Sequence, residues 1–259
     1  ILTLADGSKV ILDNTHNGVV ANQGNIQVDK RESGELVYHA NDSANAVLKT
    51  QFNSISTPVG SQYQVSLSDG SKVWLNALST IKYPTAFTGD ERVVQLTGEA
   101  YFEVEKNKSK PFKVILANNT SVEVLGTHFD VMAYTDEKDI DATLLEGSIK
   151  VSKGDKNKTI IPGEQAKVND DIKVSTVNAE EAIAWKNGLF SFDRSDTQSI
   201  MRQIGRWYGV DIIYQGKVPD NQFTGYIART SNLSEVLKML EVSGVKSTLK
   251  NNRITITNE

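Results

Sequence analysis

Short strand-like segments separated by turn residues fill about the first 175 residues and most constrain the fold of this 259-residue chain. Runs rich in Val, Ile and Phe alternate with Asn, Gly, Asp and Lys at intervals of about 8–12 residues. This spacing is typical of a sandwich, barrel or solenoid. Amphipathic helical patterns of useful length are missing from this part of the sequence, so we predict that it is all-β.

Two segments of this part, residues 2–13 and 65–76, share an Asp-Gly-Ser-Lys sequence between apolar alternations. Each predicts a hairpin around an Asp-Gly turn. A three-residue loop puts the apolar residues of each copy on one face: Val65, Leu67, Val73 and Leu75 in one copy, and Leu2, Leu4, Val10 and Leu12 in the other. A two-residue loop would divide them between two faces, so the odd loop is favoured. The repetition indicates a duplicated β-unit or successive layers of a stack.

The pattern changes near Asn178, where residues 178–181 resemble a capping box and predict a short connecting helix. Further capping boxes begin at Ser195 and Asn232, and each precedes an apolar helical stripe that ends at Gly209 or Gly244. Strand-like stretches flank both helices: residues 189–192, 210–214, 223–227 and 245–249. The C-terminal part is therefore predicted as a duplicated strand–helix–strand unit.

These patterns predict a mostly β protein, solenoid-like or sandwich-like with duplicated hairpins, followed by a small α+β module. The all-β domain spans residues 1–177, the connecting helix residues 178–188, and the module of two βαβ units residues 189–259. Residues 1–60 form either a separate first layer or part of the main β-domain.

Composition excludes several classes of function. With 28 Lys and Arg against 32 Asp and Glu, the net charge is −4, and no basic block suggests nucleic-acid binding. The chain has no cysteine, which rules out disulfides, zinc–thiolate sites, iron–sulfur clusters and a catalytic thiol. No stretch approaches the roughly 20 apolar residues of a membrane span. Because the sequence opens inside a strand-like pattern, we expect a fragment of a longer protein.

Catalytic motifs are poorly represented. The histidines His16, His39 and His128 stand apart, without metal-ligand spacing. No nucleophile elbow, Walker loop, dinucleotide fingerprint or EF-hand loop occurs. We therefore expect no metal, no cofactor and no enzyme that turns over a substrate.

Polar and aromatic clusters have simpler structural explanations. Alternation puts Glu99, Tyr101, Glu103 and Glu105 on one strand face, and a solvated polar face is favoured over a glycosidase acid pair. Core packing is favoured over a sugar platform for four aromatic residues: Trp74, Tyr83, Tyr101 and Phe102. The basic run at residues 106–110, closed by Pro111, is predicted to be a loop.

Several motifs, in one order, resemble the FecR family of bacterial transmembrane anti-sigma factors. They lie at residues 69–76, 98–104, 111–112, 124–131, 145–151 and 162–166. The module after residue 188, with Arg206-Trp207-Tyr208-Gly209-Val210, resembles the C-terminal domain of the Bacteroidetes branch. That domain is related to the short N-terminal signalling module of secretins and TonB-dependent transporters.

The resemblance implies a location and partners. The chain looks like the periplasmic part of a single-pass inner-membrane protein, anchored through a span upstream of this sequence. A cytoplasmic domain, also upstream, would hold an extracytoplasmic-function sigma factor. The periplasmic part would contact the signalling domain of a TonB-dependent outer-membrane transporter, and membrane and periplasmic proteases would release the sigma factor. In this branch the transporters are often of the glycan-importing type, so nutrient sensing is the implied context.

The resemblance also singles out Gly126 and Thr127, since several family members cut themselves at a Gly-Thr bond in this segment. The Thr127 hydroxyl would attack the preceding carbonyl in an N→O acyl shift, which needs a strained peptide and a nearby base. His128 is adjacent, but alternation points it to the opposite strand face. The alternative is a Gly-Thr turn between two strands.

Partner binding is expected on residues 223–227 of the C-terminal module: Phe223, Thr224, Gly225, Tyr226 and Ile227. An exposed strand edge can add a strand from a similar domain, and a glycine within the strand allows close backbone approach. The alternative is that Gly225 marks a bulge and that Phe223 and Tyr226 pack inward.

Two other functions stay open at this level. One is a periplasmic glycan-binding protein or glycoside hydrolase with a β-solenoid body, which needs an exposed aromatic groove and two close carboxylates. The other is a structural secretin-like module, which the C-terminal part fits but residues 69–166 do not.

Overall fold

The computed structural model describes residues 1–12, 17–23, 26–32, 35–40, 50–218 and 220–257, so Asp13 and His16 lie outside the described residues. The chain divides into two compact units. Unit 1 comprises residues 1–58 and 62–179, and unit 2 comprises residues 59–61 and 180–259. Among the helices of the described residues, none is both long and apolar enough to cross a membrane.

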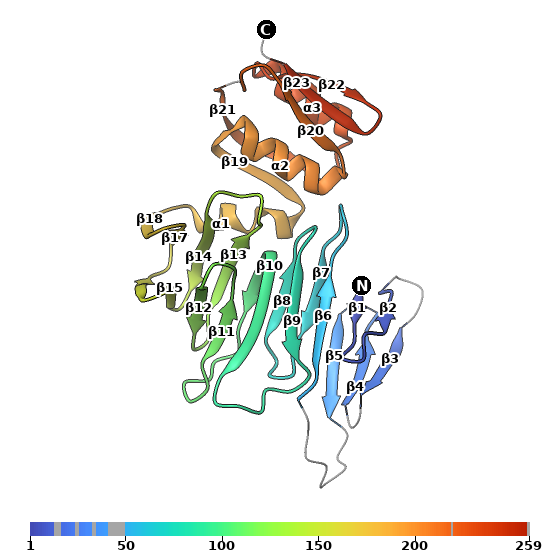
Figure 1. Ribbon diagram of the computed structural model, residues 1–259, viewed down its shortest axis with the longest axis vertical. Helices are drawn as coiled ribbons and strands as arrows, with labels where there is room; N and C mark the ends of the chain where they lie inside the picture. The colour runs from blue at the N-terminus through green and yellow to red at the C-terminus, as the bar shows by residue number, and fades with distance from the viewer. Residues whose placement is uncertain (13–16, 24–25, 33–34, 41–49, 219, 258–259) are drawn as a thin grey trace. The chain divides into compact units, whose positions relative to one another are not determined.

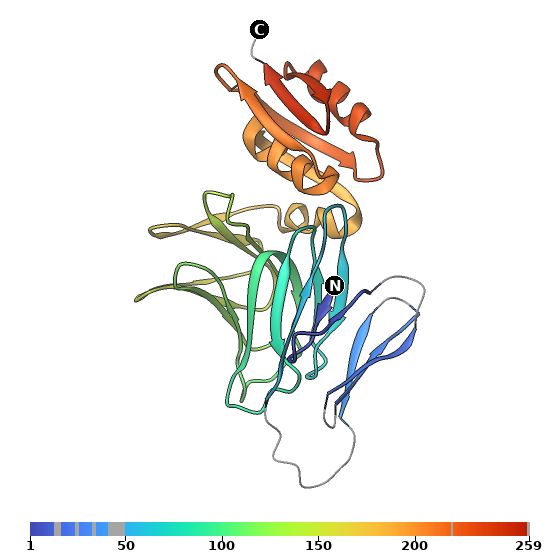
Figure 2. The same ribbon diagram turned by 45° about the vertical axis from the view of Figure 1, so that its right-hand side comes forward.

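Unit 1 consists of two facing β-layers, which can be followed in Figures 1 and 2 from the blue strands to the yellow ones. Layer A pairs in the order β2 (Lys9–Val10), β1 (Leu2–Thr3), β6 (Phe52–Ser56), β9 (Thr80–Pro84), β10 (Arg92–Glu103), β11 (Phe112–Ile115), β12 (Thr120–Val124), β15 (Ile149–Lys153) and β16 (Lys156–Ile160). Layer B pairs in the order β3 (Gly18–Gln23), β4 (Ile26–Lys30), β5 (Leu36–Ala40), β7 (Tyr63–Ser66), β8 (Lys72–Leu75), β10, β13 (His128–Ala133), β14 (Ile140–Glu146), β17 (Glu164–Val168) and β18 (Ile172–Thr176). The predicted mostly β, sandwich-like architecture is confirmed.

Strand β10 belongs to both layers. Residues 92–97 pair with β9 and β11 in layer A, and residues 98–103 pair with β8 and β13 in layer B. The change occurs at Gly98, whose φ is +90°. The inward side chains of β10, among them Ala100 and Phe102, enter the hydrophobic core that both layers enclose.

The duplicated hairpins have the predicted odd loops. Val65 lies opposite Val73, and the Leu67 N–H donates to the Ser71 carbonyl at 2.8 Å. In the first copy the Leu4 N–H donates to the Ser8 carbonyl at 2.9 Å. Strands from the first 60 residues lie in both layers, and buried residues such as Leu2 belong to the common core. This part of the chain therefore completes the main β-domain and is not a separate layer.

Unit 2 contains the predicted strand–helix–strand units. A helical turn, α1 (Ala179–Ala182), and a 3₁₀ turn, η1 (Ala184–Asn187), precede them. The elements that follow are β19 (Leu189–Asp196), α2 (Thr197–Tyr208), β20 (Asp211–Gln215), β21 (Gln222–Ala228), α3 (Leu233–Val242), β22 (Lys246–Lys250) and β23 (Arg253–Thr257). The first strands of the two strand–helix–strand repeats pair with each other, β19 with β21. The remaining strands form a second sheet, in which β20 and β22 flank β23. Figure 1 shows these elements in orange and red.

Two details of unit 2 differ from the prediction. Helix α2 is capped by Asp196 rather than Ser195, because the Asp196 carboxylate accepts the Ser199 N–H at 2.7 Å. The central strand β23 was not predicted at all. Its turn, Asn251-Asn252, has φ values of +51° and +59°, and asparagine is among the residues that tolerate this conformation. The capping box of α3 on Asn232 and Glu235 is confirmed.

Candidate functional site

The Gly126–Thr127 peptide lies between β12 and β13. The Thr127 N–H donates to the Val104 carbonyl at 3.3 Å, and the Val104 N–H donates to the Thr127 carbonyl at 3.0 Å. Thr127 is buried. The segment is thus a short connection between two strands that is held against the end of β10.

Two close approaches enclose this peptide. A Cβ atom at Gly126, whose φ is +145°, would lie 2.5 Å from the Cα of Lys106. A Cβ at Gly147 would lie 2.9 Å from the Thr127 Oγ1 and 3.1 Å from the Gly126 carbonyl oxygen. Glycine is required at both positions because a side chain would overlap with neighbouring backbone or with the hydroxyl.

The surroundings of the Thr127 hydroxyl bear on its chemistry. It donates to the Ser148 backbone carbonyl at 3.3 Å, a group that cannot serve as a general base. His128 is partly exposed, and its Nδ1 lies 3.2 Å from the Glu146 Oε2. Thr127 and His128 therefore face opposite sides of the strand, as alternation predicts, and the imidazole is not the base that an acyl shift would need.

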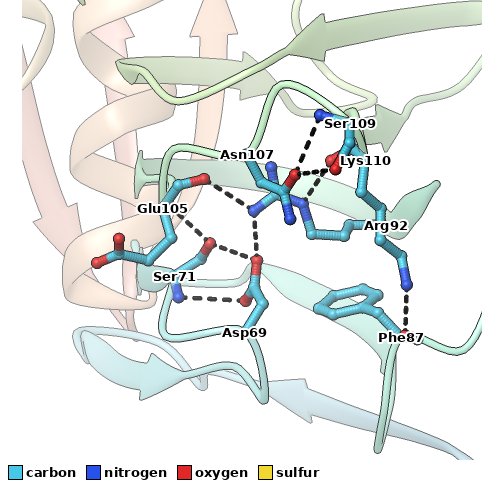
Figure 3. A network of polar contacts seen from close by, with 8 residues as sticks. All are labelled: Asp69, Ser71, Phe87, Arg92, Glu105, Asn107, Ser109 and Lys110. Carbon is cyan, nitrogen blue, oxygen red and sulfur yellow. Dashed lines mark hydrogen bonds and ion pairs between the residues drawn. The ribbon is translucent and has the colours of Figure 1, made fainter. Parts of the chain in front are cut away.

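Arg92 forms a buried polar network beside this segment (Figure 3). Its Nη1 lies 2.7 Å from the Asp69 Oδ2 and donates to the Glu105 carbonyl at 2.9 Å. Its Nε donates to the Lys110 carbonyl at 2.9 Å. The guanidinium also lies over the ring of Phe112, 5.4 Å from its centroid. We did not predict this network, because a single arginine in a strand normally indicates a solvated position.

The carboxylates of the predicted polar face do not form an exposed acid pair. The Glu99 Oε2 accepts the Asn76 Nδ2 at 2.5 Å, and Glu103 lies opposite both Lys72 and His128. Glu105 follows the end of β10 in the exposed loop. Tyr101 on the same face is buried, so the expectation of a fully solvated face was wrong.

Three of the four aromatic residues considered for a sugar platform are buried. Tyr83, Tyr101 and Phe102 are buried, while Trp74 is half-buried and packs against Tyr101 with ring centroids 5.6 Å apart. The prediction of core packing is therefore confirmed for the three buried residues and wrong for Trp74. No cluster of three or more potential metal ligands occurs among the residues that the structure covers, and His16 is not one of these residues.

The candidate partner strand, β21, divides into two faces. Phe223 is buried and Ile227 packs against the core, whereas Tyr226 is 60% exposed. The Thr224 Oγ1 accepts the Arg194 N–H at 3.1 Å. The bulge lies in β19, between Phe192 and Ser195, and not at Gly225. The alternative interpretation was therefore right for Phe223 and wrong for Gly225 and Tyr226.

Comparisons with known proteins agree with this architecture. The model of the FecR protein family matches residues 53–150, and the model of the FecR C-terminal region matches residues 189–256. No curated protein sequence matches the chain.

Two crystal structures of a protein described as an anti-sigma factor from Parabacteroides distasonis ATCC 8503, at 1.65 and 2.50 Å resolution, are similar to the chain. Each has 31% sequence identity and a TM-score of 0.75, and the match covers 80% of this chain and 99% of the other. With near-complete coverage of that relative, and with family models matching both units, the chain belongs to the FecR family of anti-sigma factors.

Proposed function

We propose that the chain is the periplasmic part of an anti-sigma factor that relays the state of a TonB-dependent outer-membrane transporter to an extracytoplasmic-function sigma factor. The relay works by contact between proteins and by regulated proteolysis. A single membrane span and a cytoplasmic sigma-binding domain, both outside this sequence, complete the protein. Membership of the FecR family supports the sigma factor as the final partner.

The observation that carries the transporter contact is the chemistry of the sheet edges in unit 2. Edge strands commonly avoid unwanted pairing through charged side chains or bulges. Strand β19 has a bulge with Asp193 and Arg194, β20 begins at Asp211, and β22 carries Lys246 and Lys250. Strand β21, with the sequence Gln-Phe-Thr-Gly-Tyr-Ile-Ala, has neither a charge nor a bulge of its own.

The outer strands of unit 1 are protected in the same way. Lys156 and Lys158 lie on β16, Lys173 on β18 and Lys9 on β2. Strand β3 lacks a charge, but its pairing is interrupted by a bulge after Val19. Among the described edge strands, β21 is therefore the one best suited to accept a strand from a partner.

On β21 the partner would meet Thr224 and Tyr226 on the exposed face and the backbone at Gly225. A Cβ at Gly225 would have no atom within 4 Å, so the glycine is not required by packing within this chain. We assign the strand-addition site to these three residues, with Phe223 and Ile227 holding β21 on the core.

The Gly126–Thr127 bond is the cleavage site in this proposal. The Thr127 hydroxyl oxygen bonds to the Gly126 carbonyl carbon, the peptide C–N bond breaks, and the nitrogen takes up the hydroxyl proton. Water then hydrolyses the resulting ester and restores the hydroxyl. The step occurs once per chain and is not turnover. Because β12 pairs with β15, and β10 pairs with β13, the two fragments would stay bound in one sandwich.

The proposed relay is tested by calorimetric titration of the protein with the purified signalling domain of a TonB-dependent transporter from the same bacterium. We expect a one-to-one complex. A panel of glycans, titrated in parallel, tests the remaining alternative of a glycan-binding protein. Glycan binding or hydrolysis without any binding of the signalling domain would contradict the proposal.

A further inference from the structure

Residues 105–110 form a mostly exposed loop, called the strap below, whose two ends are held by one buried side chain (Figure 3). Arg92 is only 2% exposed and donates to the carbonyl oxygens of Glu105 and Lys110, both at 2.9 Å. The Lys110 Nζ donates to the Phe87 carbonyl at 2.6 Å. The strap is thus fixed at both ends by Arg92, while the side chains between them are exposed.

Asp69 fixes the arginine and one end of the strap together. Its Oδ2 pairs with Arg92 and also accepts the Ser71 hydroxyl at 2.7 Å. The Ser71 Oγ in turn accepts the Glu105 N–H at 3.0 Å. Since removing one partner of a buried ion pair leaves an uncompensated charge, the strap depends on Asp69 more strongly than an exposed loop depends on a surface contact.

The middle of the strap covers the Gly126–Thr127 bond. The Asn107 N–H donates to the Leu125 carbonyl at 2.8 Å, and the close approach of Lys106 to Gly126 leaves no space for a side chain. The turn at Gly147 closes the other side of the same peptide. A protease needs a segment that can leave its neighbours and enter a cleft, so this bond is protected while the strap is in place.

We infer that the strap is a cover over the Gly126–Thr127 bond and that the ion pair between Arg92 and Asp69 controls how often the cover opens. This rests on the proposed function in one respect, that proteases act on the chain, and it is separate from the self-cleavage proposed above, which is intramolecular and needs no protease. Separating Arg92 from Asp69 removes the anion that holds the guanidinium between the Glu105 and Lys110 carbonyls, and so weakens the hold of Arg92 on both ends of the strap.

The chain offers a matched control for the test. In the first copy of the hairpin, the Asp6 Oδ1 accepts the Ser8 N–H at 2.9 Å and the Ser8 hydroxyl at 2.6 Å, so its turn resembles that of Asp69. Asp6 is exposed, and its turn is remote from the strap in sequence. Asp6→Asn therefore repeats the chemical change of Asp69→Asn without affecting the strap.

The experiment exposes each folded variant to proteinase K and identifies the cuts by fragment mass. For Asp69→Asn we expect cutting within the strap and at residues 125–127 to be about tenfold faster or more, whereas Asp6→Asn changes it less than about twofold. Hydrogen exchange at the Asn107 amide should accelerate in parallel, while the amides of β11 and β15 keep their protection. Equal cutting rates for the two variants would overturn the inference.

A second variant covers the case in which Asp69→Asn does not fold. Arg92→Lys keeps the charge but cannot make the forked contacts to Glu105 and Lys110 simultaneously, so it should also accelerate cutting in the strap. An unchanged cutting rate in this variant refutes the inference that Arg92 controls the strap, whatever the titration with the transporter domain shows. Faster cutting together with no binding of the transporter domain contradicts the proposed relay but supports the inference about the strap.

Discussion

Gly98 lies directly against Ser79 at the point where β10 passes from one layer to the other. A Cβ at Gly98 would be 2.5 Å from the Ser79 Oγ and 2.7 Å from its Cα. The same hydroxyl accepts the Glu99 N–H at 2.9 Å. The contact explains how one strand serves two layers, since the backbone turns where a positive φ and the missing side chain let it approach the buried serine.

Replacement of Gly98 by alanine should therefore destabilise the protein by about 2–4 kcal/mol, through backbone strain and overlap with Ser79. Gly7 has a similar φ of +85°, and a Cβ added there would have no atom within 4 Å. Gly7→Ala should cost only about 1 kcal/mol. Urea unfolding of both variants measures the difference, and equal losses would contradict a role for close packing at Gly98.

The N-terminal strands should contribute directly to the stability of unit 1. Leu36 on β5 is fully buried in the common core, so Leu36→Ala should cost about 2–5 kcal/mol. Val19 on β3 is 54% exposed, and Val19→Ala should cost less than about 1 kcal/mol. If both substitutions had small effects on thermal unfolding, the first 40 residues would have to be independent of the core.

Asp141 on β14 predicts a pH dependence of stability. Burial raises the pKa of its carboxyl from 3.8 to about 6, with Glu137 and Asp139 adding to the rise and Lys167, whose Nζ lies 3.7 Å away, opposing it. The folded state therefore binds the proton of the Asp141 carboxyl more tightly than the unfolded chain does. The stability that this proton contributes is fully present below about pH 4 and is lost as the pH rises through about 6.

The variant Asp141→Asn, which mimics the protonated form, should therefore gain stability relative to the wild type between pH 4 and pH 7.5, by up to ~3 kcal/mol. Chemical unfolding at the two pH values gives the comparison. A difference in stability between variant and wild type that is the same at both pH values would show that ionisation of Asp141 does not destabilise the folded state.

The helix cap of α2 can be tested with neighbouring residues. Because the Asp196 carboxylate accepts the Ser199 N–H, Asp196→Ala should cost about 1 kcal/mol, while Asp196→Asn should retain most of the cap. Ser195→Ala should have little effect on thermal unfolding. A larger loss from Ser195→Ala than from Asp196→Ala would restore Ser195 as the cap.

Features set by nearby residues were predictable from the sequence. The odd hairpin loops follow from local alternation, and the ends of α3 follow from Asn232 and Gly244, because each depends on residues a few positions apart. The α2 cap was misplaced by one residue because Ser195 and Asp196 are both good caps. Strand β23 could have been found from the Asn-Asn turn that precedes its alternating residues.

Features set by distant residues were not predictable in this way. The sequence around Arg92 does not indicate that Asp69 will neutralise it inside the protein, since the two come together only when β10 closes both layers. The burial of Tyr101 likewise depends on what packs over its strand face, whereas alternation only gives the face. The candidate cleavage bond came from a family resemblance and the partner residues from the glycine within an edge strand, and both remain predictions.

The affinity of the protein for the transporter signalling domain, measured for matched edge variants, tests the relay most directly. Tyr226→Lys places a charge on β21, and Thr248→Lys places one on β22, an edge that already carries Lys246 and Lys250. We predict at least about tenfold weaker binding for Tyr226→Lys, or ~1.4 kcal/mol, and wild-type binding for Thr248→Lys. Wild-type affinity in folded Tyr226→Lys would contradict β21 as the contact through which the signal enters this chain.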